Sequence, residues 1–196
     1  ILIFIIQFFF GGIEECVISS YYVIDRFQVY RIITSTFTHL SILHLAFNLL
    51  SFYNINTYLE RKYGSIFMFY AILLFTLVNG LLYVGIYQLL GVLFGSSFHY
   101  VSAAGFSGVI FSLLTLESYV IEVDTLPIFG LINVPRKWFA VVYLILMSVI
   151  MPGVSFIGHL CGVVSGFLFA SGYLNWLVPM HCLVRVEKGC FGSMLK

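Results

Sequence analysis

Charged side chains are scarce in this sequence. Lys, Arg, Asp and Glu make up 9% of its 196 residues, whereas a soluble domain carries about a quarter. The formal net charge is +1, so the chain lacks a basic surface for phosphate groups, and this excludes nucleic acid as a partner. Hydrophobic residues make up 61%. This composition indicates a membrane protein in contact with the lipid bilayer.

Paired cysteines are lacking as well. The four cysteines stand at positions 16, 161, 182 and 190 with no regular spacing, which predicts neither a disulfide framework nor a zinc site. The sequence has no low-complexity run and no obvious internal repeat. It begins with Ile1, so we expect it to start inside a longer protein, and we interpret residues 1–196 as one transmembrane domain.

The apolar segments between the charged residues suit membrane helices. Crossing a bilayer takes about 20 apolar residues, and lipid tolerates no unpaired backbone. We expect helices near residues 1–10, 42–59, 65–91, 105–121, 138–151 and 155–177. We expect the first to be truncated, the loop over 11–38 to lie at the interface, and a short cytosolic tail to begin at about 178. The expected fold is an all-α membrane protein, a bundle of six transmembrane helices.

Lysine and arginine indicate the orientation of this bundle. With six helices, Arg26 and Arg31 fall on one side of the membrane. The basic residues expected on the other side are Arg61, Lys62, Arg136, Lys137, Arg185, Lys188 and Lys196. Cytosolic loops carry the excess of positive charge. The helices over 42–59, 105–121 and 155–177 therefore begin at the lumenal or external face.

Polar side chains gather where those three helices begin. The segments read "THLSILHLAFN", "GFSGVIF" and "SFIGHLCGVVSG". They carry His39, His44, Asn48, Ser107 and His159. Ionisable groups inside a membrane are costly and usually face the interior of a bundle or a water-filled cavity. These residues are therefore candidates for a shared site.

Ser107 and His159 together suggest nucleophilic catalysis. A serine hydroxyl is a weak nucleophile until a neighbouring base takes its proton, and imidazole suits that task near neutral pH. Contact between residues so far apart in the sequence requires close helix packing, which small residues allow. The small residues on the two helices are Gly105, Gly108, Ser112, Gly158, Gly162 and Gly166.

Amide hydrolysis also needs donors for the oxyanion that develops on the carbonyl. His44 and Asn48 stand four positions apart on one helix, so both can face one point. The backbone N–H of Ser107 would be a third donor.

Other readings of these residues stay open on the sequence alone. A single histidine in a membrane helix can be a hydrogen-bonded packing residue. His39, His44 and His159 could bind a metal, although the five-residue spacing of the first two does not stack them on one helical face. A small transporter is a further alternative, but it predicts polar groups along the full depth of the bundle rather than in its outer half. We assign no catalytic role to Glu117.

Together the motifs resemble the rhomboid family of intramembrane serine proteases, from about Phe27 to Trp176. "HLSILHLAFN" is similar to the family's H-x4-H-x3-N, "GFSG" to its G-x-S-G, and "GHLCGVVSG" to its G/A-H-x2-G-x3-G. The three motifs occur in the family's order and on its helices. The chain looks most similar to the eukaryotic six-helix, rhomboid-domain-containing branch.

The resemblance implies a role for each candidate residue. Ser107 would be the nucleophile, His159 its base and acid, and His44 and Asn48 the oxyanion donors, with no acidic third member. Structural positions near the site are implied for His39, Gly105, Gly108, Phe111 and Gly162.

Two positions depart from the family pattern. Phe111 replaces a tyrosine that often stacks on the catalytic histidine, and we expect the stacking to survive because the ring is kept. Tyr30 replaces the tryptophan of a first-loop W-R pair, whose arginine is matched by Arg31.

The implied function is a Ser-His endopeptidase without metal or organic cofactor. It would cut transmembrane protein substrates near the lumenal or external end of their helices, in the endoplasmic reticulum or another secretory-pathway membrane. The alternative is a catalytically inactive rhomboid-like protein that binds membrane helices in quality control. The presence of both Ser107 and His159 favours the protease.

The expected orientation can be tested with glycosylation acceptors. A site inserted between Gly11 and Thr38 should be modified in a secretory-pathway host, because that loop should be lumenal. A site added after Lys196 should stay unmodified. The reverse pattern of gel-mobility shifts would overturn the topology.

Overall fold

The computed structural model describes residues 2–128, 130–151 and 153–178. The tail residues Arg185, Lys188 and Lys196 lie outside this part of the chain. The α-helices are α1 (Leu2–Phe10), α2 (Arg31–Phe37), α3 (Ile42–Tyr63), α4 (Ser65–Phe94), α5 (Ser107–Val120), α6 (Arg136–Ile150) and α7 (Phe156–Ala170). The remaining elements are η1 (Tyr21–Asp25), η2 (Ser96–Tyr100), η3 (Asn175–Leu177), β1 (Thr125–Ile128) and β2 (Ile132–Pro135).

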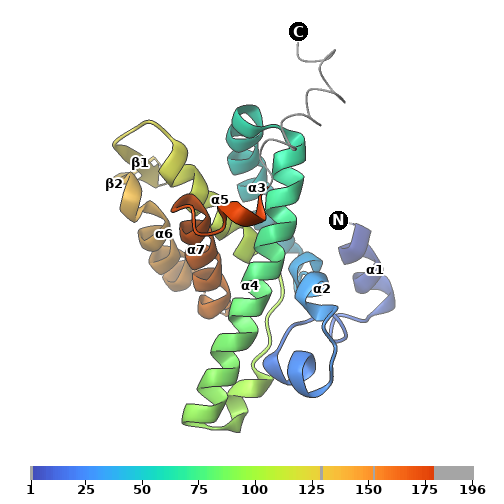
Figure 1. Cartoon of the computed structure of the whole chain (residues 1–196). Coiled ribbons are helices and arrows are strands. Elements are labelled where there is room, and N and C mark those ends of the chain that lie inside the picture. The colour runs from blue at the N-terminus through green and yellow to red at the C-terminus, as the bar shows by residue number, and fades with distance from the viewer. Residues whose placement is uncertain (1, 129, 152, 179–196) are drawn as a thin grey trace.

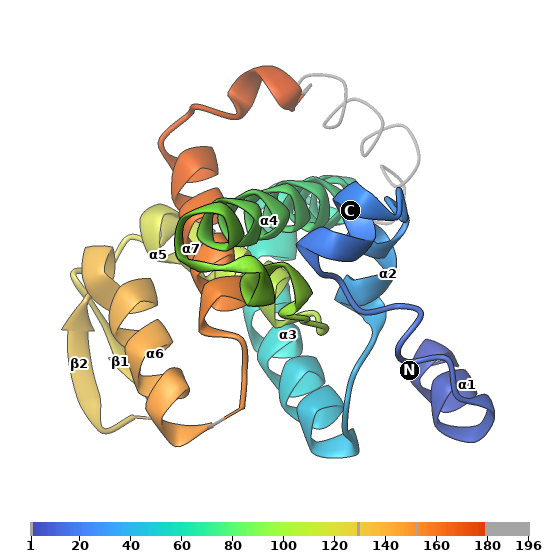
Figure 2. The same cartoon turned by 90° about the horizontal axis from the view of Figure 1, so that it is seen from below.

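Helix α4 forms the centre of the molecule. Figure 1 shows it running between α5, α6 and α7 on one side and α1 and α2 on the other, and Figure 2 gives the same arrangement along the helix. Its 30 residues make it long and apolar enough to cross a bilayer. Gly64, with φ of 90°, separates it sharply from α3. The other elements therefore pack around one long apolar helix.

The six-span bundle stays a prediction. Among the described residues, α4 is the single helix that is both long and apolar enough to span a bilayer. Helices α2 and α3 meet this test only as a pair, with a bend of 90° between them, as in a broken span or a re-entrant loop. Helices α5 and α7 are apolar but have 14 and 15 residues. Helix α7 ends at Ala170, before the expected boundary at 177.

A small hairpin between α5 and α6 departs from the all-α expectation. Strands β1 and β2 pair antiparallel, with Ile128 opposite Ile132, and Gly130 takes φ of 71° in the turn between them. Ile128 and Val134 are buried in the core that α5 and α6 share. Ile132 and Val134 alternate with Asn133 as in a strand, but Pro127 interrupts the first run, so the sequence signal for this hairpin is weak.

The loop before α3 is organised around Arg31. This side chain is only 4% exposed, and its Nη1 donates to the carbonyls of Glu14 and Val17 at 2.6 and 2.8 Å. Its Nε donates to Gln28 Oε1 at 2.6 Å, and the guanidinium lies 4.0 Å from the centre of the Tyr22 ring. The segment over 11–38 is therefore a folded layer rather than a free linker.

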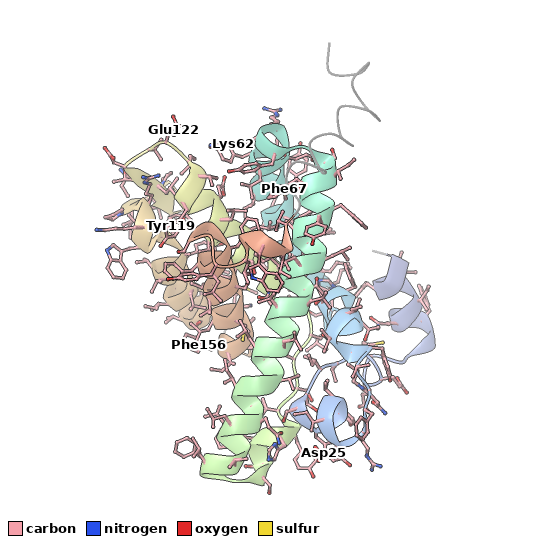
Figure 3. The ribbon with its side chains drawn as sticks, in the orientation of Figure 1. Asp25, Lys62, Phe67, Tyr119, Glu122 and Phe156 are labelled. Carbon is pink, nitrogen blue, oxygen red and sulfur yellow. The ribbon has the colours of Figure 1, made fainter. Side chains whose placement is uncertain are left out.

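Basic side chains hold three helix ends together. Lys62 Nζ donates to the carbonyl of Val120 at 2.7 Å, and Arg136 Nη1 donates to that of Ile121 at 2.8 Å. The end of α3, the end of α5 and the start of α6 thus share one end of the molecule. Figure 3 shows Lys62 and Glu122 at this end and Asp25 at the opposite one. Cations at the carboxyl end of α5 also offset its helix dipole.

The anchoring role of Arg31 can be tested by unfolding the purified protein in detergent. Arg31→Leu should lower the unfolding midpoint by several degrees, because it removes the hydrogen bonds of a buried guanidinium to the carbonyls of Glu14 and Val17, and hydrogen bonds to charged groups contribute about 1.5–3 kcal/mol each. Arg26→Leu is the matched control, since Arg26 is exposed and bonds the Tyr21 hydroxyl instead. Equal midpoints for the two variants would contradict this role of Arg31.

Candidate functional site

Helices α5 and α7 pack in parallel at backbone distance. A Cβ on Gly162 would collide with the carbonyl oxygen of Gly108 and lie 2.8 Å from Phe111 Cβ. A turn further along, a Cβ on Gly166 would collide with the carbonyl oxygen of Ser112. Only glycine leaves room for such an approach.

This packing brings Ser107 and His159 together. Ser107 is the first residue of α5, and His159 lies in the first turn of α7. Ser107 Oγ lies 2.8 Å from His159 Nε2. The Phe111 ring stacks on the imidazole with the centroids 4.5 Å apart. Among the described residues His159 Nδ1 has no hydrogen-bond partner, so stacking rather than a carboxylate orients the ring.

The pair opens into a cavity of about 510 Å³. Residues from α2, α4, the start of α3 and the segments before α5 and α7 line it. Its wall includes Ser107, His159, His44, Gly105 and Gly108. No Asp, Glu, Lys or Arg is among the described lining residues. The cavity is therefore shaped for an uncharged part of a ligand.

Helix α3 brings the predicted oxyanion donors to different places. The Ser41 side chain caps this helix by accepting a hydrogen bond from the N–H of His44 at 3.1 Å, and the His44 side chain reaches the cavity. Asn48 is 7% exposed and is not among the lining residues. Its Nδ2 has no acceptor within the described chain. Asn48 therefore has a free donor one turn behind His44.

His39 and Gly105 support His44. The rings of His39 and His44 meet edge to face with centroids 5.2 Å apart. Gly105 takes φ of 128°, and a Cβ there would lie 2.6 Å from the His44 ring. Its N–H donates to the carbonyl of Ser35 at 2.8 Å. The loop before α5 is thus fixed between α2 and the His44 ring.

Two lining residues were missed from the sequence. Asn79 and Tyr83 both reach the cavity wall from α4. The Tyr83 hydroxyl donates to the carbonyl of Val101 at 3.3 Å, which ties α4 to the segment before α5. An amide inside an apolar helix is itself a signal of a functional position, so Asn79 could have been found.

No metal-binding group is apparent in the described residues. No three His, Cys, Asp or Glu side chains there are grouped so that they could hold an ion. The chemistry that the arrangement supports is that of a serine with a neighbouring base.

Comparison with known protein families identifies the family of this chain. Residues 26–176 match the model of the Rhomboid domain. The chain belongs to the rhomboid family. Membership makes it a membrane protein and places it among intramembrane proteases and their rhomboid-like relatives.

Curated rhomboids support the assignment. Rhomboid-like protein 15 of Arabidopsis thaliana is 38% identical over 85% of this chain and 42% of its own length. Rhomboid-related protein 4 of Homo sapiens is 31% identical over 83% of this chain and 50% of its own length. Rhomboid-type serine protease 2 of Eremothecium gossypii is 29% identical over 95% of this chain and 70% of its own length. The chain spans about half the length of the first two relatives.

The close packing at Gly162 gives a prediction for this rhomboid. Gly162→Leu should force α5 and α7 apart and reduce the rate at which a fluorophosphonate probe labels Ser107 at least about tenfold. A misplacement of 1 Å can cost about 100-fold in rate. The matched control is Gly85→Leu on α4, where an added Cβ meets nothing within 4 Å. Full labelling of a folded Gly162→Leu protein would contradict the contact.

Proposed function

We propose that this chain is an intramembrane serine endopeptidase in which Ser107 and His159 form the catalytic dyad. The observation that carries the proposal is the 2.8 Å contact between Ser107 Oγ and His159 Nε2 at the wall of a cavity. Family membership and the name of the fungal serine protease relative support it.

The dyad would act first by acyl transfer. His159 Nε2 takes the proton of Ser107 as Oγ attacks the carbonyl carbon of the scissile peptide bond. The imidazolium then gives this proton to the leaving amine, and the C–N bond breaks. Phe111 keeps the ring in place for both transfers, because it stacks on the imidazole.

The negative charge on the carbonyl oxygen would meet two donors at the cavity, the N–H of Ser107 and the His44 side chain, with Asn48 as a third once it moves. The N–H of Ser107 can donate to it, because Ser107 is the first residue of α5 and the first N–H groups of a helix have no acceptor within the helix. His44 lies on the cavity wall, and Asn48 holds its unpaired amide one turn behind. Asn48 contributes only after a shift of α3 or of its side chain toward the cavity.

A water activated by His159 would then release the acyl group from Ser107. We propose transmembrane proteins as substrates, cut near the lumenal or external end of their helices, in a secretory-pathway membrane. The cavity supports this because its wall carries no formal charge among the described residues. The second candidate is a rhomboid-like protein that binds membrane helices without cutting them.

Single and double substitutions of the dyad test the proposal. Ser107→Ala and His159→Ala should each abolish cleavage of co-expressed, tagged transmembrane proteins, and the double variant should be no worse, because the two residues act as a unit. Asn48→Ala should cost less, at most about 100- to 1000-fold in rate, since the nucleophile and the other donors stay in place.

The matched control is Ser118→Ala on the same helix. The Ser118 hydroxyl is buried and donates to the Thr115 carbonyl of its own helix at 2.7 Å. Continued cleavage by a folded, inserted Ser107→Ala protein would refute the protease and leave the helix-binding candidate.

A further inference from the structure

Beneath the dyad, three buried polar side chains from three helices meet. Asn79 lies on α4, Ser112 on α5 and Ser165 on α7. Both serines are 0% exposed, and Asn79 is 9% exposed. Asn79 Nδ2 lies 3.0 Å from Ser112 Oγ, the two serine oxygens lie 2.8 Å apart, and Ser165 Oγ lies 2.5 Å from Asn79 Oδ1.

These contacts close into a ring with one direction. The amide nitrogen can only donate and the amide oxygen can only accept. Asn79 therefore donates to Ser112, Ser112 donates to Ser165, and Ser165 donates to Asn79. In this arrangement each hydroxyl gives one proton to the ring and receives one. The carbonyls of Gly108 and Gly162 lie 3.0 Å from the Ser112 and Ser165 hydroxyls and compete for the same protons. Hydrogen bonds arranged head to tail also strengthen one another in a low-dielectric interior.

The ring lies where α5 and α7 approach most closely. Ser112 Oγ is 3.0 Å from the Gly108 carbonyl, and Ser165 Oγ is 3.0 Å from the Gly162 carbonyl. Gly108 follows Ser107 directly, and Gly162 is one turn after His159. Glycine packing limits how near the two helices can come, but it does not hold them in register along their axes.

We propose that the Asn79–Ser112–Ser165 ring positions the dyad by locking α5 and α7 to α4 in one register. This inference rests on the proposed function. In lipid no water competes for these groups, so a register shift would have to break the ring. A shift of 1 Å between α5 and α7 would separate Ser107 Oγ from His159 Nε2. Ser112 and Ser165 are positioning residues, since neither of them lines the cavity, whereas Asn79 joins them to the cavity wall.

Ser165→Ala separates positioning from stability. Without Ser165, the Ser112 hydroxyl still reaches the Gly108 carbonyl at 3.0 Å and Asn79 Oδ1 at 3.4 Å. No buried donor is stranded, so the cost in stability should be small. The variant loses the hydrogen bonds that join Ser165 on α7 to Ser112 on α5 and Asn79 on α4.

The experiment compares purified parent, Ser165→Ala, Ser112→Ala and the double variant in detergent. Ser165→Ala should lower kcat for a tagged transmembrane substrate, and the rate of fluorophosphonate labelling, at least about tenfold. KM should stay within about twofold, because substrate binding is untouched while the alignment of Ser107 with His159 is lost. The double variant should be no slower than the slower single variant, since either change opens the ring. Ser118→Ala should match the parent, because it removes a buried hydroxyl whose hydrogen-bond partner in the described part of the chain lies on its own helix.

Each outcome decides one proposition. Parent-like kcat and labelling in a folded Ser165→Ala protein would overturn the ring while the protease stands. A rise in KM of more than about twofold and a lower thermal stability, together with equal losses in Ser118→Ala, would also overturn it, because packing alone would then explain the effect. A parent that is neither labelled nor active would overturn the proposed function, and the positioning role with it.

Discussion

The contact between the backbones of α5 and α7 is the constraint on which the rest of this structure depends. Gly162 and Gly166 have no side chains where the carbonyls of Gly108 and Ser112 pass. A larger residue at either position would move α7 away from α5 and remove His159 from Ser107. Glycine at these two positions removes side-chain packing, but it lets the helices come close enough for the hydrogen bond between Ser107 and His159.

The other elements hold α5 and α7 in place from several sides. Helix α4 supplies Asn79 below the dyad and Tyr83 beside the cavity. The layer around Arg31 holds α2, whose Ser35 carbonyl fixes Gly105, two residues before Ser107. Lys62 and Arg136 close the far end of α5. A short helix is thus held at both ends and along its side, which suits a residue that must stay aligned during a reaction.

Several parts of the site could be read from the sequence. Ser107, His159 and the glycines near them stand in motifs whose spacing predicts a meeting of two helix ends, and the stacking of Phe111 follows from keeping an aromatic ring at that position. The hairpin over Thr125–Pro135 and the ring through Asn79 could not be read in the same way. A polar residue in an apolar helix signals a partner but does not say which one, because the partners lie on other helices.

The sequence by itself determined the apolar composition that suits a bilayer, the family motifs and the expectation that Ser107 meets His159, because these depend on residue type and local spacing. Tertiary structure alone decided which donors face the cavity. His44 reaches its wall, whereas Asn48, one turn away on the same helix, does not. The four-residue spacing puts both side chains on one face. His44 packs against Gly105, far away in the chain, at the cavity wall, and such contacts between distant segments decide which of the two side chains meets the cavity.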